Sequence, residues 1–208
     1  MRETTLCGTH YEMGRQIGLE LRASGEELPK LSGEQARYTE ALSRGLAGQI
    51  PDLLEEMRGI AEGGGYDELA VRFRSLAVGI VPSCTVVAVS GAHTVHGRPL
   101  FGRNYDGPEH SRFTLYRTYP SRGLSHIGCC GYNLLVGRED GLNEAGLAIA
   151  VAGVEGHYTS RPGVWDHIPV RAALEQCRTA DEAVGSRLFR TFERRASSWR
   201  TRPEPSLR

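Results

Sequence analysis

Apolar residues recur at helical spacing in the first eighty residues of the chain. The segment 11–21 places them four positions apart, at Met13, Ile17 and Leu21, and the segment 51–61 has a similar one-sided pattern. Pro51 suits a first helical turn, and the glycines at 63–65 mark the end of that helix. The pattern predicts a mostly helical segment over residues 1–83.

The pattern changes to that of strands at residue 84. Residues 85–89 are mainly β-branched and apolar, and a Gly-Arg-Pro turn at 97–99 leads into residues 100–103. This arrangement predicts a β-hairpin.

More strands and two more helices are predicted beyond the hairpin. Strand patterns cover 113–119, 124–129 and 146–154, and the last is apolar on both faces, which favours a place inside the sheet. A helix is expected over 168–176, and Thr179 with Glu182 resembles a capping box for a shorter one. Helices, a mainly antiparallel sheet and then helices indicate the α+β class.

Residues 187–208 have no sustained apolar periodicity. They contain seven arginines and two glutamates, with the serine pair 197–198 and the prolines at 203 and 205. This composition predicts a disordered arginine-rich tail. An arginine-rich arm that binds nucleic acid is the less favoured alternative, because no pattern of stacking aromatic residues accompanies the charge.

The overall composition narrows the classes of partner. The formal net charge is zero and the pI is about 7.1, so neither a nucleic acid nor a membrane partner is indicated. The chain lacks an apolar run of membrane-spanning length and a signal sequence, which favours a soluble cytoplasmic protein. The five cysteines are irregularly spaced, so we expect neither a disulfide framework nor a metal site. The oligomeric state stays open.

Cys84 is the residue with the clearest chemical potential. It directly precedes the β-branched run, so its thiol can be exposed at the start of a strand. If the bond before it were cut, the freed α-amine could act as its base, and no catalytic histidine would be needed. Taken alone, a buried and inert cysteine is the commoner alternative.

Four stretches in order along the chain carry a family resemblance: 8–18, 55–63, 83–89 with 97–106, and 140–148. Together they resemble the autoproteolytic acyltransferases and hydrolases typified by isopenicillin N acyltransferase, which are N-terminal-nucleophile hydrolases. A more distant similarity is to choloylglycine hydrolases such as penicillin V acylase. The resemblance extends to about residue 184.

The resemblance implies a fold, an activity and a set of site residues. The fold would be an αββα sandwich, and Cys84 would be the nucleophile, released by autoproteolysis of the Ser83–Cys84 bond. Arg103 would lie near the thiol, and Asp106 would hold the new α-amine. The substrate would be a small N-acyl amide or an acyl thioester, and no cofactor would be needed.

Two residues are candidates for the oxyanion site. The backbone N–H near Gly153 is a candidate donor because relatives place one at the corresponding strand end, although a packing glycine is an equal alternative. Asn143 is the second candidate, and a turn-forming role is the favoured alternative for it.

The chain also departs from the family pattern. Ser83 occupies the position before the nucleophile where acyltransferase members usually have glycine, and relatives have well over a hundred further residues. Because the motifs end near residue 184, we expect a C-terminally truncated member with an incomplete sandwich. The parts would be the helical segment 1–83, a partial hydrolase domain over 84–186 and the tail 187–208. A catalytically silent fragment of the family is the alternative function.

Overall fold

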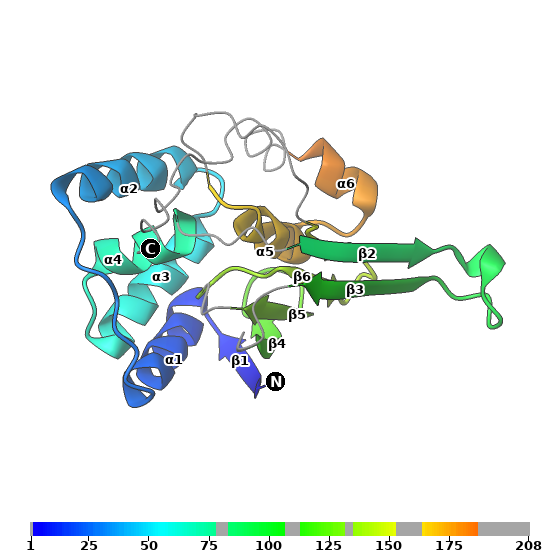
Figure 1. Ribbon diagram of the computed structural model, residues 1–208, viewed down its shortest axis with the longest axis horizontal. Helices are drawn as coiled ribbons and strands as arrows, with labels where there is room; N and C mark the ends of the chain where they lie inside the picture. Colours follow the sequence, from blue (N-terminus) through cyan, green and yellow to red (C-terminus); the bar gives the residue numbers. More distant parts are fainter. Residues whose placement is uncertain (1, 78–82, 107–112, 132–134, 153–163, 187–208) are drawn as a thin grey trace, which may run out of the picture.

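The computed structural model describes residues 2–77, 83–106, 113–131, 135–152 and 164–186 (Figure 1). Within these residues the chain forms six α-helices and seven strands in two sheets. The predicted α+β class is therefore confirmed. The predictions for Gly153 and for the tail 187–208 lie outside the described residues.

Four helices form the N-terminal part of the molecule: α1 (His10–Ala23), α2 (Gly33–Leu46), α3 (Pro51–Gly64) and α4 (Glu68–Leu76). The helices predicted over 11–21 and 51–61 are confirmed as α1 and α3. Thr9 and Ser32 form capping boxes at the starts of α1 and α2, and α3 ends at Gly65 in the left-handed conformation.

Helices α1 and α3 lie in direct backbone contact. A Cβ atom on Gly14 would lie 2.0 Å from the carbonyl oxygen of Glu56, and one on Gly59 would lie 2.2 Å from that of Tyr11. A Cβ atom on Gly18 or Gly63 would lie 2.3 or 2.4 Å from a carbonyl oxygen of the opposite helix. Only glycine permits this approach, so the close packing of the two helices explains the spacing of their glycines.

The larger sheet has the strand order β1-β4-β5-β6-β7. Its strands are β1 (Arg2–Gly8), β4 (Phe113–Pro120), β5 (His126–Gly131), β6 (Asp140–Asn143) and β7 (Ala148–Ala150). β1 was not predicted, and it pairs in parallel with β4, whereas the other neighbours are antiparallel. The strand predicted over 146–154 does exist as β7, but its predicted place inside the sheet is wrong, because β7 is the last strand of the order and half-buried.

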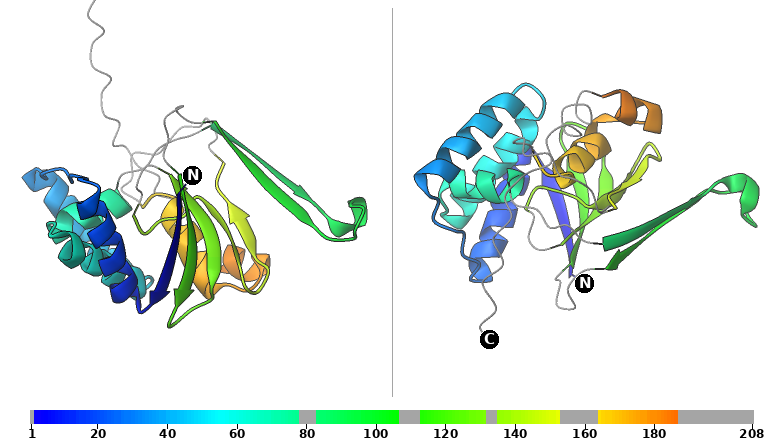
Figure 2. Two further views of the ribbon diagram at one scale, coloured as in Figure 1. Left: turned by 90° about the horizontal axis from the view of Figure 1, so that it is seen from below. Right: turned by 45° about the horizontal axis from the view of Figure 1, so that its top comes forward.

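One face of this sheet is covered by helices. Side chains at alternate positions point to it, and Leu6, Thr118, His126 and Asn143 are all buried there. Helix α5 (His167–Gln176), which confirms the helix predicted over 168–176, contacts β6 and β7. The short helix α6 (Ala180–Gly185) lies on the same side (Figure 2). No helix of the described residues covers the other face, which carries Leu115, Ile127 and Leu142.

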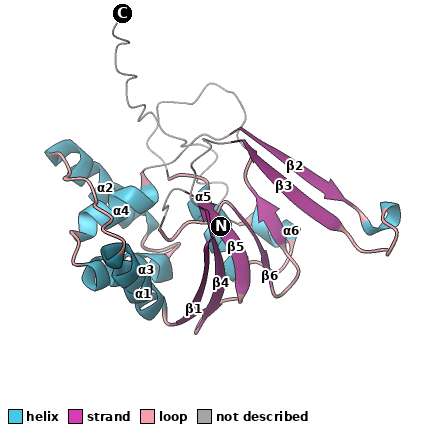
Figure 3. Cartoon of the chain, turned by 60° about the horizontal axis from the view of Figure 1, so that its bottom comes forward, coloured by secondary structure: helices cyan, strands magenta, loops and turns pink. Residues whose placement is uncertain are grey.

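Strands β2 (Ser83–Val89) and β3 (Leu100–Asp106) form the second sheet, and they confirm the predicted hairpin. Figures 2 and 3 show that the hairpin extends away from the body of the molecule toward its tip. Its base is anchored by an edge-to-face contact between Tyr105 and Phe113, whose ring centroids are 4.6 Å apart.

A buried network of charged side chains joins α1, α3 and α5. Arg171 of α5 lies 2.9 Å from Glu56 of α3 and 2.6 Å from Glu175, and Glu175 lies 2.9 Å from His10 of α1. These four side chains are nearly inaccessible to solvent. The network therefore connects the helical N-terminal part to the helix that covers the sheet.

Candidate active site

Cys84 and Arg103 lie on the same face of the hairpin. Cys84 pairs with Tyr105 and Arg103 pairs with Val86, so both side chains point to one side of the two strands. Arg103 Nη1 lies 3.7 Å from Cys84 Sγ and donates a hydrogen bond to it. Cys84 is half-buried in this arrangement. The structure thus brings together the two residues for which sequence predicted a nucleophile and a nearby cation.

Two carboxylates hold the guanidinium of Arg103. Its Nε donates to Asp140 Oδ2 at 2.8 Å, and its Nη2 donates to Glu139 Oε2 at 3.2 Å. The side chains of Arg103 and Glu139 are 6% and 4% exposed, so both ends of that ion pair are screened from water. Each of the three guanidinium nitrogens has a different partner, which fixes the plane of the group.

Burial and charge act against each other in this cluster. Burial alone would lower the pKa of Arg103, but the charges of Asp140 and Glu139 outweigh it and the pKa is raised. Burial raises the pKa of the Glu139 carboxyl, although Arg103 opposes that shift. Arg103 is therefore a permanent cation.

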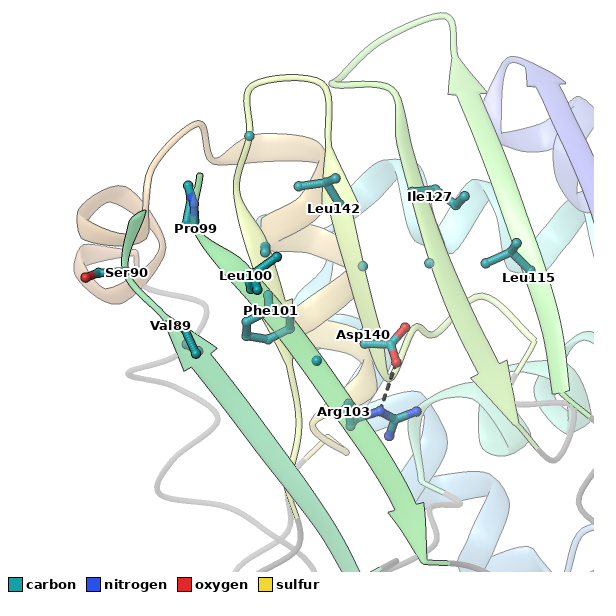
Figure 4. Close-up of a pocket in the computed structure, with 16 residues that line it drawn as sticks. Val89, Ser90, Pro99, Leu100, Phe101, Arg103, Leu115, Ile127, Asp140 and Leu142 are labelled. Atoms are coloured by element: carbon teal, nitrogen blue, oxygen red, sulfur yellow. Dashed lines mark hydrogen bonds and ion pairs between the residues drawn. The ribbon is translucent and has the colours of Figure 1, made fainter. Parts of the chain in front are cut away.

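A cleft of about 960 Å³ lies between the hairpin and the free face of the sheet (Figure 4). Leu100 and Phe101 of the hairpin form one wall, and Leu115, Ile127 and Leu142 form the opposite wall. Arg103 and Asp140 also line it and provide its charged groups, and Figure 4 shows their side chains directed toward one another. The cleft is an apolar site with a polar end next to Cys84.

Asp106 occupies a different place from Cys84 and Arg103. It pairs with Ser83 across the hairpin, so its side chain points to the face opposite that of the Cys84 thiol. Its carboxylate is exposed and accepts a hydrogen bond from the Asn104 amide. Along the strand, however, Asp106 and Tyr105 are the residues opposite the Ser83–Cys84 bond.

Asn143 is buried at the turn between β6 and β7, with all its side-chain hydrogen bonds made to the main chain. Its amide nitrogen donates to the carbonyls of Leu174 and Cys177 at 3.0 and 2.7 Å. Its oxygen accepts from the N–H groups of Ala145 and Leu147 at 3.1 and 3.0 Å. No donor is left for an oxyanion, and this geometry fits the turn-forming alternative.

Other thiols and imidazoles differ in their surroundings. Cys129 of β5 is half-buried, and burial together with Asp140 raises the pKa of its thiol to about 11, which makes it a poor nucleophile at neutral pH. Cys130 next to it is buried in the core. His126 is buried on the helix-covered face, and burial lowers its pKa to about 3. His126 is therefore a neutral structural histidine.

Sequence reasoning assigned no role to Glu139 or Asp140. Asp140 was recognised only as the first residue of the motif at 140–148, and Glu139 was not singled out. The signal for their role is the pairing of β5 with β6, because it places Asp140 opposite Cys129 on the face that looks toward the hairpin. In the described part of the chain, no group of three or more His, Cys, Asp or Glu side chains could hold a metal ion. The helices described there are all too short or too polar to span a bilayer.

Fold and site together define an α+β protein with a cysteine and a buried arginine at the polar end of an apolar cleft. The family model described as acyl-coenzyme A:6-aminopenicillanic acid acyl-transferase matches residues 94–198, about half of the chain. The chain belongs to this family. No curated protein shows significant similarity to the chain.

The matched region contains part of the site. It includes Arg103, Asp106, Glu139 and Asp140, and it begins after Cys84. It also continues past residue 184, where the sequence motifs of the family resemblance end. Membership of the family gives the chain an acyltransferase-like or hydrolase-like function.

Proposed function

We propose that the chain is a cysteine amidohydrolase or acyltransferase of the N-terminal-nucleophile type, with Cys84 as its nucleophile. The observation that carries the proposal is the contact of Cys84 Sγ with Arg103 Nη1 at 3.7 Å, next to the apolar cleft. A fixed guanidinium stabilises a thiolate, and the thiolate is the nucleophilic form of cysteine.

Activation requires cleavage of the Ser83–Cys84 bond. The Cys84 thiol attacks the carbonyl carbon of Ser83, the peptide nitrogen leaves as the new α-amine, and water then hydrolyses the thioester to free the Ser83 carboxylate. The register of the hairpin supports a role for Asp106 at this point, because Asp106 is opposite Ser83. Once the amine is released, the Asp106 carboxylate would orient it by a charge-assisted hydrogen bond.

Turnover would then follow two steps. The α-amine of Cys84 accepts the thiol proton while sulfur attacks the acyl carbonyl, and the same proton passes to the leaving amine or thiol. The product of this step is a thioester between the acyl group and Cys84. Water or an amine then attacks the thioester, which releases the acid or a new amide and restores the thiol.

The cleft supports an apolar acyl group as the part of the substrate held by the enzyme. Its walls are formed by Leu100, Phe101, Leu115, Ile127 and Leu142. A volume of about 960 Å³ is at the upper end of the range for small-molecule sites. The substrate class would be small N-acyl amides or acyl thioesters, with the scissile carbonyl at the polar end near Arg103.

The arrangement of layers supports a partial αββα sandwich as the framework. Helices cover one face of the larger sheet, and the β2–β3 hairpin stands against the other face at its base (Figure 3). The hairpin would belong to the second sheet of the sandwich. Cys84 would then begin a strand that faces the sheet across the cleft.

Cleavage of the purified chain tests this proposal. Intact-mass measurement is expected to find fragments 1–83 and 84–208 in the parent protein, and only the full chain in Cys84→Ala. Cys7→Ala is the matched control, because Cys7 is an exposed thiol on β1, and it should be cleaved like the parent. A Cys84→Ala chain that is still cut between 83 and 84 would remove Cys84 from the reaction. An uncleaved parent chain that also fails to turn over acyl thioesters would favour the catalytically silent alternative.

A further inference from the structure

The guanidinium of Arg103 is bound by two carboxylate residues, and each of these has a further hydrogen bond to strand β5. Asp140 accepts from Arg103 Nε through Oδ2, while its Oδ1 accepts from the backbone N–H of Cys129 at 3.0 Å. The main chain of Glu139 is tied to β5, because its N–H donates to the Cys129 carbonyl at 2.9 Å. Both carboxylates are therefore set by the larger sheet, whereas Cys84 and Arg103 belong to the hairpin.

We propose that Asp140 and Glu139 are positioning residues, which hold the Arg103 guanidinium so that Nη1 is directed at the Cys84 thiol. The geometry that supports this is the use of a separate nitrogen for each partner: Nε for Asp140, Nη2 for Glu139 and Nη1 for Cys84. With two nitrogens fixed, the third has a single direction in the plane of the group. The proposal rests on the proposed role of Cys84 as nucleophile and adds how the sheet prepares it.

Asp140 and Glu139 could affect the Cys84 thiol in two ways, by their negative charge or by holding Arg103 in place. The two effects on thiolate formation are opposite in sign. Asp140 and Glu139 are anionic, so their charges alone disfavour a thiolate at Cys84, and removing one charge should make the thiolate form at lower pH. If instead their main effect is to hold Arg103 in place, removing one should make the thiolate form at higher pH. The sign of the change separates the two effects.

The experiment measures the pH dependence of Cys84 alkylation by iodoacetamide in the full chain, with the modified residue identified by mass spectrometry. In Asp140→Asn, the side-chain oxygen can still accept from Cys129 N–H, but the amide N–H₂ then faces Arg103 Nε and the anchor is lost. The pH midpoint of alkylation is expected to rise by about half a unit or more. A midpoint that falls or stays constant would overturn the proposal.

The double variant Asp140→Asn with Arg103→Met shows whether the effect passes through Arg103. Arg103→Met alone should raise the midpoint, by about one unit, because the neighbouring cation is removed. In that background Asp140→Asn should lower the midpoint or leave it unchanged. A further rise would mean that Asp140 acts on Cys84 by another route, and the proposal would be wrong.

Two further variants complete the experiment, one as a control and one as a substitute for Asp140→Asn. Glu3→Gln removes the carboxylate that pairs with Arg117 between β1 and β4, far from the thiol in register, and should leave the Cys84 midpoint unchanged. If Asp140→Asn does not fold, Glu139→Gln tests the same guanidinium through Nη2 and should also raise the midpoint. The state of the 83–84 bond is determined from the same mass spectra, and only chains in the same state are compared. Because the readout is alkylation, its outcome does not depend on whether the proposed substrates are turned over.

Discussion

The charged side chains around Arg171 are the clearest example of how single residues stabilise this molecule. Arg171 and Glu56 are fully buried, and each has a partner of opposite charge. The Arg171 charge lowers the pKa of Glu175 to about 2 in spite of burial, with a further contribution from its hydrogen bond with His10. Breaking such a pair from one side leaves a buried charge unpaired, at a cost of about 3–5 kcal/mol.

His10 gives this network a pH dependence. Burial alone would lower the pKa of His10, but the hydrogen bond and charge of Glu175 outweigh it, Glu56 adds to the rise, Arg171 opposes it, and the net shift is upward. A raised pKa in the folded state means that charged His10 stabilises the fold fully below its unfolded pKa of about 6.5. This contribution is lost as the pH rises through the folded pKa.

We therefore expect His10→Gln to destabilise the chain more at pH 6 than at pH 9, by about 2 kcal/mol at pH 6. Chemical unfolding at both pH values measures the difference from the parent, so the opposing effects of His126 and other histidines cancel. His93→Gln is the control, because His93 is exposed, and its effect should be small at both pH values. A destabilisation by His10→Gln that is equal at pH 6 and pH 9 would contradict the assigned charge.

Residue roles were predictable to the extent that they depend on neighbours in the chain. The family motif predicts that Arg103 lies near Cys84. The structure places them together because they lie on adjacent strands of one hairpin. Arg103 and Asp140 are 37 residues apart, and their contact depends on where the hairpin stands relative to the sheet. No local pattern contains that information.

At the scale of elements, the packing of α1 on α3 explains the glycines of both helices. A methyl group at position 18 would lie 2.3 Å from the carbonyl oxygen of Ile60 and 2.7 Å from the backbone nitrogen of Gly64. Backbone atoms at these distances cannot move aside as a side chain can. Gly45 of α2, by contrast, has open space where its Cβ would lie.

Gly18→Ala and Gly45→Ala are consequently expected to have opposite effects on stability. Gly18→Ala should destabilise the fold by about 1–3 kcal/mol, because the helices must separate. Gly45→Ala should stabilise it by about 0.5–1 kcal/mol, because alanine has the higher helix propensity. Denaturant unfolding in a Cys84→Ala background, where the chain is expected to stay in one piece, measures both. Equal free energies of unfolding for the Gly18→Ala and Gly45→Ala variants would contradict the close approach of α1 and α3 at Gly18.

The helices and strands that were predicted correctly are those with a strong local sequence pattern. The helices α1 and α3 have long apolar stripes and clear ends, and the hairpin has a β-branched first strand followed by a Gly-Arg-Pro turn. Strand β1 was missed because only Thr4 and Leu6 are buried in it, and its partner β4 lies more than a hundred residues along the chain. The edge position of β7 depends on the pairing of the whole sheet.

At the scale of the whole molecule, the N-terminal part and the sheet are tightly joined. β1 pairs with β4 along its full length, and Leu6 belongs to the same core as Met13 and Ile168. Glu56 and Arg171 add a buried ion pair between the two parts. Cleavage between Ser83 and Cys84 would therefore free the nucleophile without removing the contacts that hold the sheet to the helices. The cleft and the thiol would stay in place for the chemistry.

Mass spectrometry of the purified protein after reaction with an activated thioester of an apolar acyl group is the most direct test of Cys84 as the nucleophile. We predict one acyl group, located on Cys84, formed faster than on the exposed Cys7 and released by hydroxylamine. Arg103→Met should slow acylation at Cys84 and leave the rate at Cys7 unchanged. Acylation of Cys7 at an equal or higher rate than Cys84, or no acyl group on Cys84 at all, would contradict the assignment of Cys84 as the nucleophile.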